Sequence, residues 1–115
     1  MSRRAKEIEA VCKYARTVEN EGRCPHCGGP SRVASHVYPR GSYAEFAAVP
    51  SNVFGLCIEA DRNFESGFEK LSVENRIAWL RDPRNILEEF QSWVNRKLDT
   101  LELVVQEYRR ANSAE

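Results

Sequence analysis

Two short stretches decide the fold of this chain: residues 24–40, CPHCGGPSRVASHVYPR, and residues 52–61, NVFGLCIEAD. The first begins with a Cys-x-x-Cys segment, in which a proline and a pair of glycines favour a tight reversal of the backbone. It continues into alternating apolar and polar residues over Ser31–Tyr38, which predict a strand. The second contains Val, Phe and Leu residues that predict another short strand, over Asn52–Cys57. We therefore expect a small sheet beside a cysteine-containing turn.

Helices are predicted on both sides of this sheet. Apolar residues recur at helical spacing over residues 3–21, with charged residues between them. A second helix is predicted over residues 59–70, and a helical turn over 43–47. Ser72 is a typical N-cap for a short helix, and the Asp-Pro pair that begins at Asp82 predicts the start of a long helix that runs to near the C-terminus.

The length and composition favour one globular domain of the α+β class. The chain has 115 residues, of which 42% are hydrophobic, and we expect a helix over 3–21, a core over 22–70 and helices over 71–112. The formal net charge is zero, which argues against a basic coat protein for nucleic acid. The charge is nevertheless segregated, because residues 22–44 hold no acidic residue and carry three arginines: Arg23, Arg32 and Arg40.

The chain begins with an amphipathic stretch and shows neither a signal peptide nor a segment of membrane-spanning length. We therefore expect a cytoplasmic protein, of a bacterium or a phage-infected host, with no membrane partner. Cysteines in that compartment are mostly reduced, so the four cysteines are expected to be thiols or metal ligands and not disulfides.

Three of the cysteines are candidate ligands of a structural zinc ion. The spacing of Cys24 and Cys27 allows both sulfurs to bind one tetrahedral ion, and Cys57 follows the second predicted strand. A fourth ligand at the matching spacing would fall at position 60, which is Ala60. The fourth zinc ligand could be a water molecule or the side chain of Glu59, Asp61 or His36. The remaining alternative is that the cysteines bind no zinc.

The tetrapeptide from Cys24 to Cys27 is also similar to the active site of disulfide oxidoreductases such as bacterial DsbA. That chemistry needs the first thiol at a helix N-terminus, where the helix dipole lowers its pKa. Here the second cysteine is followed by Gly-Gly-Pro, which cannot continue a helix, and no βαβ pattern precedes it. We therefore expect slow alkylation of Cys24, contrary to a redox enzyme.

The order of the motifs resembles another family more closely. A Cys-x-x-Cys turn, a strand with His36 in His-Val-x-Pro-Arg, an Asn-x-x-x-Leu-Cys segment from Asn52 and a following helix are similar to the HNH (ββα-metal) endonucleases of the zinc-knuckle type. The segment is also similar to the phage NinG recombination nucleases. The resemblance covers residues 24–65 and implies a ββα-metal core with a zinc-knuckle turn, flanked by an N-terminal helix and a long C-terminal helix.

The resemblance implies a metal-dependent DNA endonuclease or nickase. His36 would be the general base that takes a proton from the attacking water, and Asn52 would brace the loop between the strands. Asp61, with Asn63 as a second candidate, would bind the divalent ion, Mg²⁺ or Mn²⁺. The planar guanidinium of Arg40 suits a phosphate, and Arg32 and Arg23 are further candidate contacts to DNA.

Three positions depart from the family pattern. Ala60 replaces a cysteine, Asp61 stands where the family has His or Asn, and Ser35 precedes the motif histidine where an acidic residue or a histidine is common. One carboxylate and one serine are a weak metal set. The alternative is therefore a catalytically inactive protein that keeps the scaffold and binds nucleic acid or regulates a partner.

The last predicted helix carries an apolar stripe with a sevenfold spacing. Its members are Leu87, Val94, Leu101 and Tyr108, with Phe90, Leu98 and Val105 beside them. Such a stripe must be covered, either by the rest of the same chain or by a second copy in a homodimer through this helix.

Overall fold

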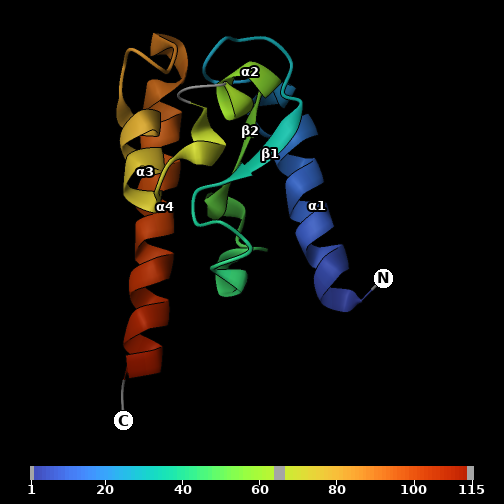
Figure 1. The fold of residues 1–115 in the computed structure, drawn as a ribbon, viewed down its shortest axis with the longest axis vertical. Helices are drawn as coiled ribbons and strands as arrows, with labels where there is room; N and C mark the ends of the chain where they lie inside the picture. The colour runs from blue at the N-terminus through green and yellow to red at the C-terminus, as the bar shows by residue number, and fades with distance from the viewer. Residues whose placement is uncertain (1, 64–66, 114–115) are drawn as a thin grey trace.

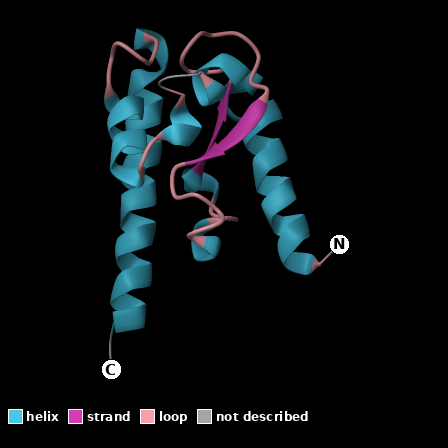
Figure 2. Ribbon diagram, in the orientation of Figure 1, coloured by secondary structure: helices cyan, strands magenta, loops and turns pink. Residues whose placement is uncertain are grey.

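Helices surround one two-stranded antiparallel sheet in the computed structural model, which describes residues 2–63 and 67–113 (Figures 1 and 2). The expected α+β class is confirmed. Helix α1 lies along one side of the sheet and α3 and α4 lie along the other (Figure 1). The elements are α1 (Arg3–Thr17), η1 (Glu19–Gly22), β1 (Val33–His36), η2 (Ala44–Phe46), η3 (Pro50–Asn52), β2 (Val53–Leu56), α2 (Ile58–Arg62), η4 (Phe68–Lys70), α3 (Val73–Arg81) and α4 (Glu88–Ser113).

The sheet forms where it is predicted, although each strand is shorter than expected. Its register pairs Val33 with Leu56 and His36 with Val53. Because side chains alternate along a strand, His36 lies on the face that meets α1, whereas Ser35 lies on the opposite face. Helix α1 packs so closely on the first face that a Cβ at Gly55 would lie 2.4 Å from the carbonyl oxygen of Ala15.

The opposite face of the sheet packs into the main core, which α4 completes. The rings of Phe54 and Trp93 meet edge to face with their centroids 5.9 Å apart. Most of the apolar stripe of α4 is buried within the same chain, so intramolecular packing is confirmed for it: Phe90, Val94, Leu98, Leu101 and Val105. Leu87 and Tyr108 remain 36% and 40% exposed, and a homodimer through α4 stays a hypothesis.

The N-terminal helix is shorter than the predicted range of 3–21. It ends at Thr17, and the next residues form the 3-10 turn η1. Asn20, Glu21 and Gly22 have φ angles of 56°, 58° and 71°, in the left-handed region that a right-handed helix cannot contain. This turn reverses the chain and leads it into the cysteine segment.

The prediction of a helix over residues 59–70 is also wrong, because the observed helix is shorter. Helix α2 stops at Arg62, because Asn63 has a non-helical conformation with ψ of 137°. The chain then folds back, and the amide of Gly67 donates to the carbonyl of Asn63 at 3.0 Å. A Cβ at Gly67 would lie 2.5 Å from the Asn63 nitrogen, so a larger residue does not fit this return. Residues 64–66, which the prediction included, lie outside the described part.

Helix α3 begins as predicted, with the amide of Asn75 donating to the Ser72 hydroxyl at 3.2 Å. The long helix does not begin at Asp82, as its Asp-Pro pair predicts, but at Glu88. Asp82 caps a separate turn, in which its carboxylate accepts from the amide of Arg84 at 2.9 Å. The amide of Leu87 then donates to the carbonyl of Pro25 at 2.9 Å. This contact with the cysteine segment takes an amide that a continuous helix would need for itself.

Candidate functional site

His36 ends β1 with its imidazole held in one orientation. Its side chain is 7% exposed, and Nε2 lies 3.0 Å from the carbonyl oxygen of Ala47. Because a carbonyl can only accept, Nε2 carries the proton of the neutral ring and Nδ1 keeps a basic lone pair. Burial lowers the pKa of His36 from its usual value of 6.5, and the nearby Arg40 charge acts in the same direction. The ring is therefore neutral at pH 7, as a general base requires.

A groove of about 400 Å³ lies between α1 and β1, with His36 in its wall. Arg40, which was predicted as a phosphate contact, lines the groove after β1, and Arg16 lines it from α1. The groove also contains Cys12: burial raises the pKa of that thiol, while Arg40 and Arg16 act against the rise. Two guanidinium groups therefore face a space beside the candidate base. The remaining lining residues are Ala5, Ile8, Glu9 and Ala34.

Asn52 is completely buried and joins the two ends of the loop between the strands. Its Oδ1 accepts from the amide of Tyr38 at 2.8 Å, and its Nδ2 donates to the carbonyl of Tyr38 at 3.1 Å. Nδ2 also donates to the carbonyl of Phe46 at 3.0 Å. These contacts are of the bracing kind that the family resemblance implies. A role for Asn52 in catalysis stays a prediction.

Asp61, the predicted metal ligand, lies on the other side of the sheet from the His36 imidazole. It is 6% exposed, and its Oδ1 accepts from the Ser35 hydroxyl at 2.7 Å. Its Oδ2 lies 3.4 Å from Nε of Arg62. Asn63, the second candidate, follows the last residue of α2, and its carbonyl accepts from Gly67. The structure thus places the candidate ligand beside Ser35, the residue next to the candidate base.

Arg76 of α3 contacts β1 on the edge that β2 does not pair. Its Nη1 donates to the carbonyl of His36 at 2.6 Å, and its other nitrogens donate to the carbonyls of Leu71 and Glu69. Burial lowers the pKa of Arg76, whereas the Asp61 and Glu69 charges act in the opposite direction. The sequence interpretation missed Arg76. Its spacing from Val73 and Leu80 places it on the buried face of α3, and a cation on such a face is the signal that could have identified it.

The acidic side chains offer few ligands for a divalent ion. In the ranges 2–63 and 67–113, the only group of three or more His, Cys, Asp or Glu side chains close enough to share an ion is the cysteine cluster. Asp61 therefore brings one carboxylate, with the Ser35 hydroxyl beside it. Such a set fits Mg²⁺ only where water and substrate phosphate complete the octahedron, which is a common arrangement for this ion.

The three predicted cysteines do come together. The sulfurs of Cys24, Cys27 and Cys57 all lie within 4.8 Å of one another. The turn is closed by the amide of Cys24, which donates to the carbonyl of Gly29 at 2.7 Å. Gly28, with φ of 78°, supplies the left-handed residue of this turn. The cluster could hold a metal ion such as zinc.

The environment of Cys24 is the opposite of what a thiol oxidoreductase needs. The residue is completely buried, and this burial raises the pKa of its thiol to about 11. The segment after Cys27 runs through turns into β1, so neither thiol lies at a helix N-terminus, the position that this redox chemistry needs. These observations argue against redox chemistry at this pair.

The predicted nucleic-acid contacts lie in different surroundings. Arg40 and Arg32 are exposed, at the groove and before β1 respectively. Arg23 instead stabilises the cysteine turn: its Nε donates to the carbonyl of Gly28 at 3.0 Å, and its guanidinium lies 4.9 Å from the centre of the Phe90 ring. A contact between these arginines and DNA stays a prediction.

Comparisons with protein-family models, curated proteins and solved structures gave no match for this chain. Among the helices in the described residues, none is both long enough and apolar enough to span a bilayer.

Proposed function

We propose that this chain is a metal-dependent DNA endonuclease or nickase of the HNH kind, built on a ββα-metal core. The observation that carries the proposal is the state of His36: a neutral imidazole, fixed at Nε2, in a groove that also contains Arg16 and Arg40. An imidazole with a pKa below its usual value and a free lone pair suits proton abstraction at neutral pH.

The groove and the sheet suggest how the residues divide the work. In hydrolysis of a phosphodiester, Nδ1 of His36 would accept the proton of the attacking water, while Arg40 and Arg16 hold phosphate oxygens by charge-assisted hydrogen bonds. Asp61 would hold a divalent ion, which would neutralise negative charge on the phosphate and on the leaving oxygen.

Zinc has a separate role in this proposal. Cys24, Cys27 and Cys57 would hold it as a structural ion that fixes the turn before β1 relative to the start of α2. The ion would therefore support the position of His36 without taking part in hydrolysis.

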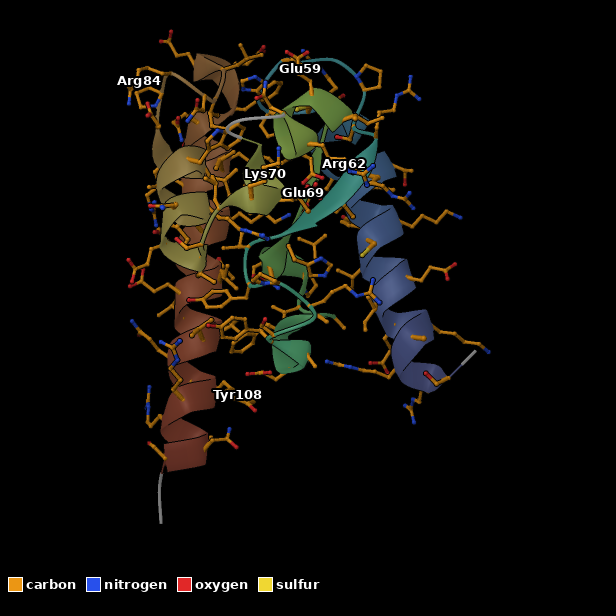
Figure 3. The ribbon with its side chains drawn as sticks, viewed as in Figure 1. Glu59, Arg62, Glu69, Lys70, Arg84 and Tyr108 are labelled. Atoms are coloured by element: carbon orange, nitrogen blue, oxygen red, sulfur yellow. The ribbon has the colours of Figure 1, made fainter. Side chains whose placement is uncertain are left out.

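A second candidate function is nucleic-acid binding without cleavage. It is favoured by the surroundings of Asp61, whose two oxygens contact Ser35 and Arg62. Figure 3 shows Arg62 near Glu69, and the Arg62 nitrogen lies 3.9 Å from the Glu69 carboxylate. A divalent ion at Asp61 must compete with these partners. A binding protein would need only the fold and the exposed arginines.

Nicking of supercoiled plasmid by the wild type and by His36→Ala, with Mg²⁺, with Mn²⁺ and with EDTA, tests the proposal. We expect metal-dependent nicking that His36→Ala abolishes. The second histidine provides a matched control, because the His26 ring packs on Trp79 with centroids 5.3 Å apart, outside the groove. His26→Gln should retain nicking.

Circular dichroism of each variant ensures that only folded protein is compared. Nicking that persists in His36→Ala would contradict the role of the base. Plasmid binding without nicking in any lane, by folded wild type, would favour the binding protein.

A further inference from the structure

The cysteine cluster offers three sulfurs to an ion that usually takes four ligands. Zinc bound tetrahedrally lies about 2.3 Å from each thiolate, which places bound sulfurs about 3.8 Å apart. The sulfurs of Cys24, Cys27 and Cys57 lie within 4.8 Å of one another, so a small contraction brings all three to one ion. All three are free cysteines and form no disulfide.

Each of these sulfurs already accepts a hydrogen bond from a backbone amide. The amide of His26 donates to Cys24 at 3.4 Å, the amide of Gly29 donates to Cys27 at 3.4 Å, and the amide of Ala60 donates to Cys57 at 3.3 Å. Backbone hydrogen bonds in the turn and at the start of α2 thus hold the three sulfurs in place.

The nearby side chains that could serve as a fourth ligand either contact other groups or lie outside the cluster. Nδ1 of His26 lies 2.5 Å from the carbonyl oxygen of Asn85, and Asp61 accepts from Ser35. Ala60, at the position of a fourth cysteine, has no side-chain atom that can bind a metal and is buried. Glu59 is exposed on the outer side of α2 (Figure 3) and is not part of the cluster. Within the described residues, no fourth protein ligand joins the three sulfurs.

The cluster is exposed to solvent at two of its three cysteines. Cys24 is completely buried, whereas Cys27 is exposed and Cys57 is partly exposed. Ile58, beside Cys57, is 52% exposed. The face of the cluster away from Cys24 is therefore open to a small molecule.

We propose that this cluster is a three-thiolate zinc site whose fourth position takes an exchangeable ligand from solution, water by default and a small thiolate when one is present. The proposal goes beyond the nuclease function and does not depend on it. Zinc sites with three protein ligands and an open position accept outside ligands, whereas sites with four are closed. The departure at Ala60 therefore changes the kind of site that the turn forms.

Absorption spectroscopy of the Co²⁺-loaded protein tests this, because thiolate-bound Co²⁺ has visible bands that respond to each ligand. We expect one Co²⁺ per chain and a saturable shift of these bands when 2-mercaptoethanol is added. Ala60→Cys should supply a fourth sulfur, and its bands should no longer respond. Cys12→Ser, which changes the cysteine outside the cluster, is the matched control and should behave as the wild type.

Glu59→Ala gives a second measurement, because this exposed position tolerates the change whether or not Ala60→Cys folds. Its bands should match the wild type before and after 2-mercaptoethanol is added. Altered bands in Glu59→Ala would identify a carboxylate as the fourth ligand and overturn the proposal. Absence of a response to 2-mercaptoethanol in the wild type, or absence of Co²⁺ binding, would overturn it as well.

Discussion

The protonation of His36 is set by its burial, and this leads to a prediction about pH. Because burial lowers the pKa of His36 below 6.5, the ring stays neutral at pH values where a free histidine is already partly charged. As the pH falls from about 8, the rate constant of nicking should therefore decline with a midpoint below pH 6.5. Single-turnover rates across this range measure it. A midpoint above pH 7 would contradict the prediction.

Asn52 is the residue whose loss should disturb the loop most. Asn52→Ala leaves the amide and carbonyl of Tyr38 and the carbonyl of Phe46 without their partner in a buried place. We expect the free energy of unfolding to fall by roughly 2–4 kcal/mol, since each unsatisfied buried group is costly. Urea denaturation measures this. Asn112→Ala, at the exposed end of α4, is the control and should change stability little.

At the scale of residues, the motif predicted the contacts that lie near it in sequence. His36 ends β1 and Asn52 joins the ends of the loop between the strands, because both positions depend on strands that the motif itself forms. Their roles in catalysis stay predictions. Arg16 and Arg76 were missed because they come from helices outside the motif. Their positions depend on how α1 and α3 pack against β1, which no local pattern contains.

At the scale of elements, α1 packs closely on β2 beside the groove. A methyl group at Gly55 would meet the carbonyl of Ala15, so Gly55→Ala should push α1 away from the sheet. We expect a loss of roughly 1–3 kcal/mol in stability, as for other overpacked sites, and weaker DNA binding in the groove. Urea denaturation and fluorescence anisotropy measure the two effects.

Gly41→Ala is the matched control, because a Cβ at Gly41 would have no heavy atom within 4 Å. It should leave both stability and binding close to the wild type. Equal effects of the two substitutions would contradict the role of close packing at Gly55.

The boundaries of the helices could be predicted only where no contact with a distant segment competed with the local capping signal. Ser72 caps α3 as its sequence indicates. The Asp-Pro pair at Asp82 is equally typical of a helix start. The amide of Leu87 nevertheless donates to the carbonyl of Pro25, and α4 begins only at Glu88. The return of the chain from Gly67 to Asn63 likewise shortens α2. Both differences arise from contacts between distant segments.

At the scale of the whole molecule, zinc should determine how stable the fold is. The cluster joins the turn before β1 to the start of α2, and a metal that binds only the folded chain stabilises it by its binding free energy. We expect EDTA to lower the Tm markedly, and Cys24→Ser to have a low Tm with or without EDTA. Cys12→Ser is the control. A Tm that does not respond to EDTA in protein purified with zinc would contradict this.

The α+β class and the meeting of the three cysteines could be predicted, because the order of strands and turns specifies them. The apolar stripe of α4 left two alternatives, and only the packing of the chain shows that Val94 and Leu101 are covered internally. Figure 3 shows Tyr108 on α4, where its ring meets Phe46 edge to face. Sedimentation equilibrium would test the remaining hypothesis of a homodimer through α4.

The hydrogen bond from the amide of Leu87 to the carbonyl of Pro25 also has a consequence for synthesis of the chain. Because a protein emerges from the ribosome N-terminus first, Cys24 and Cys27 leave before Cys57, and Leu87 leaves later still. A nascent chain therefore presents two sulfurs, then three, and docks the turn against the segment before α4 only at the end. The proposed metal ion would therefore find its three sulfur ligands before the last helix is complete.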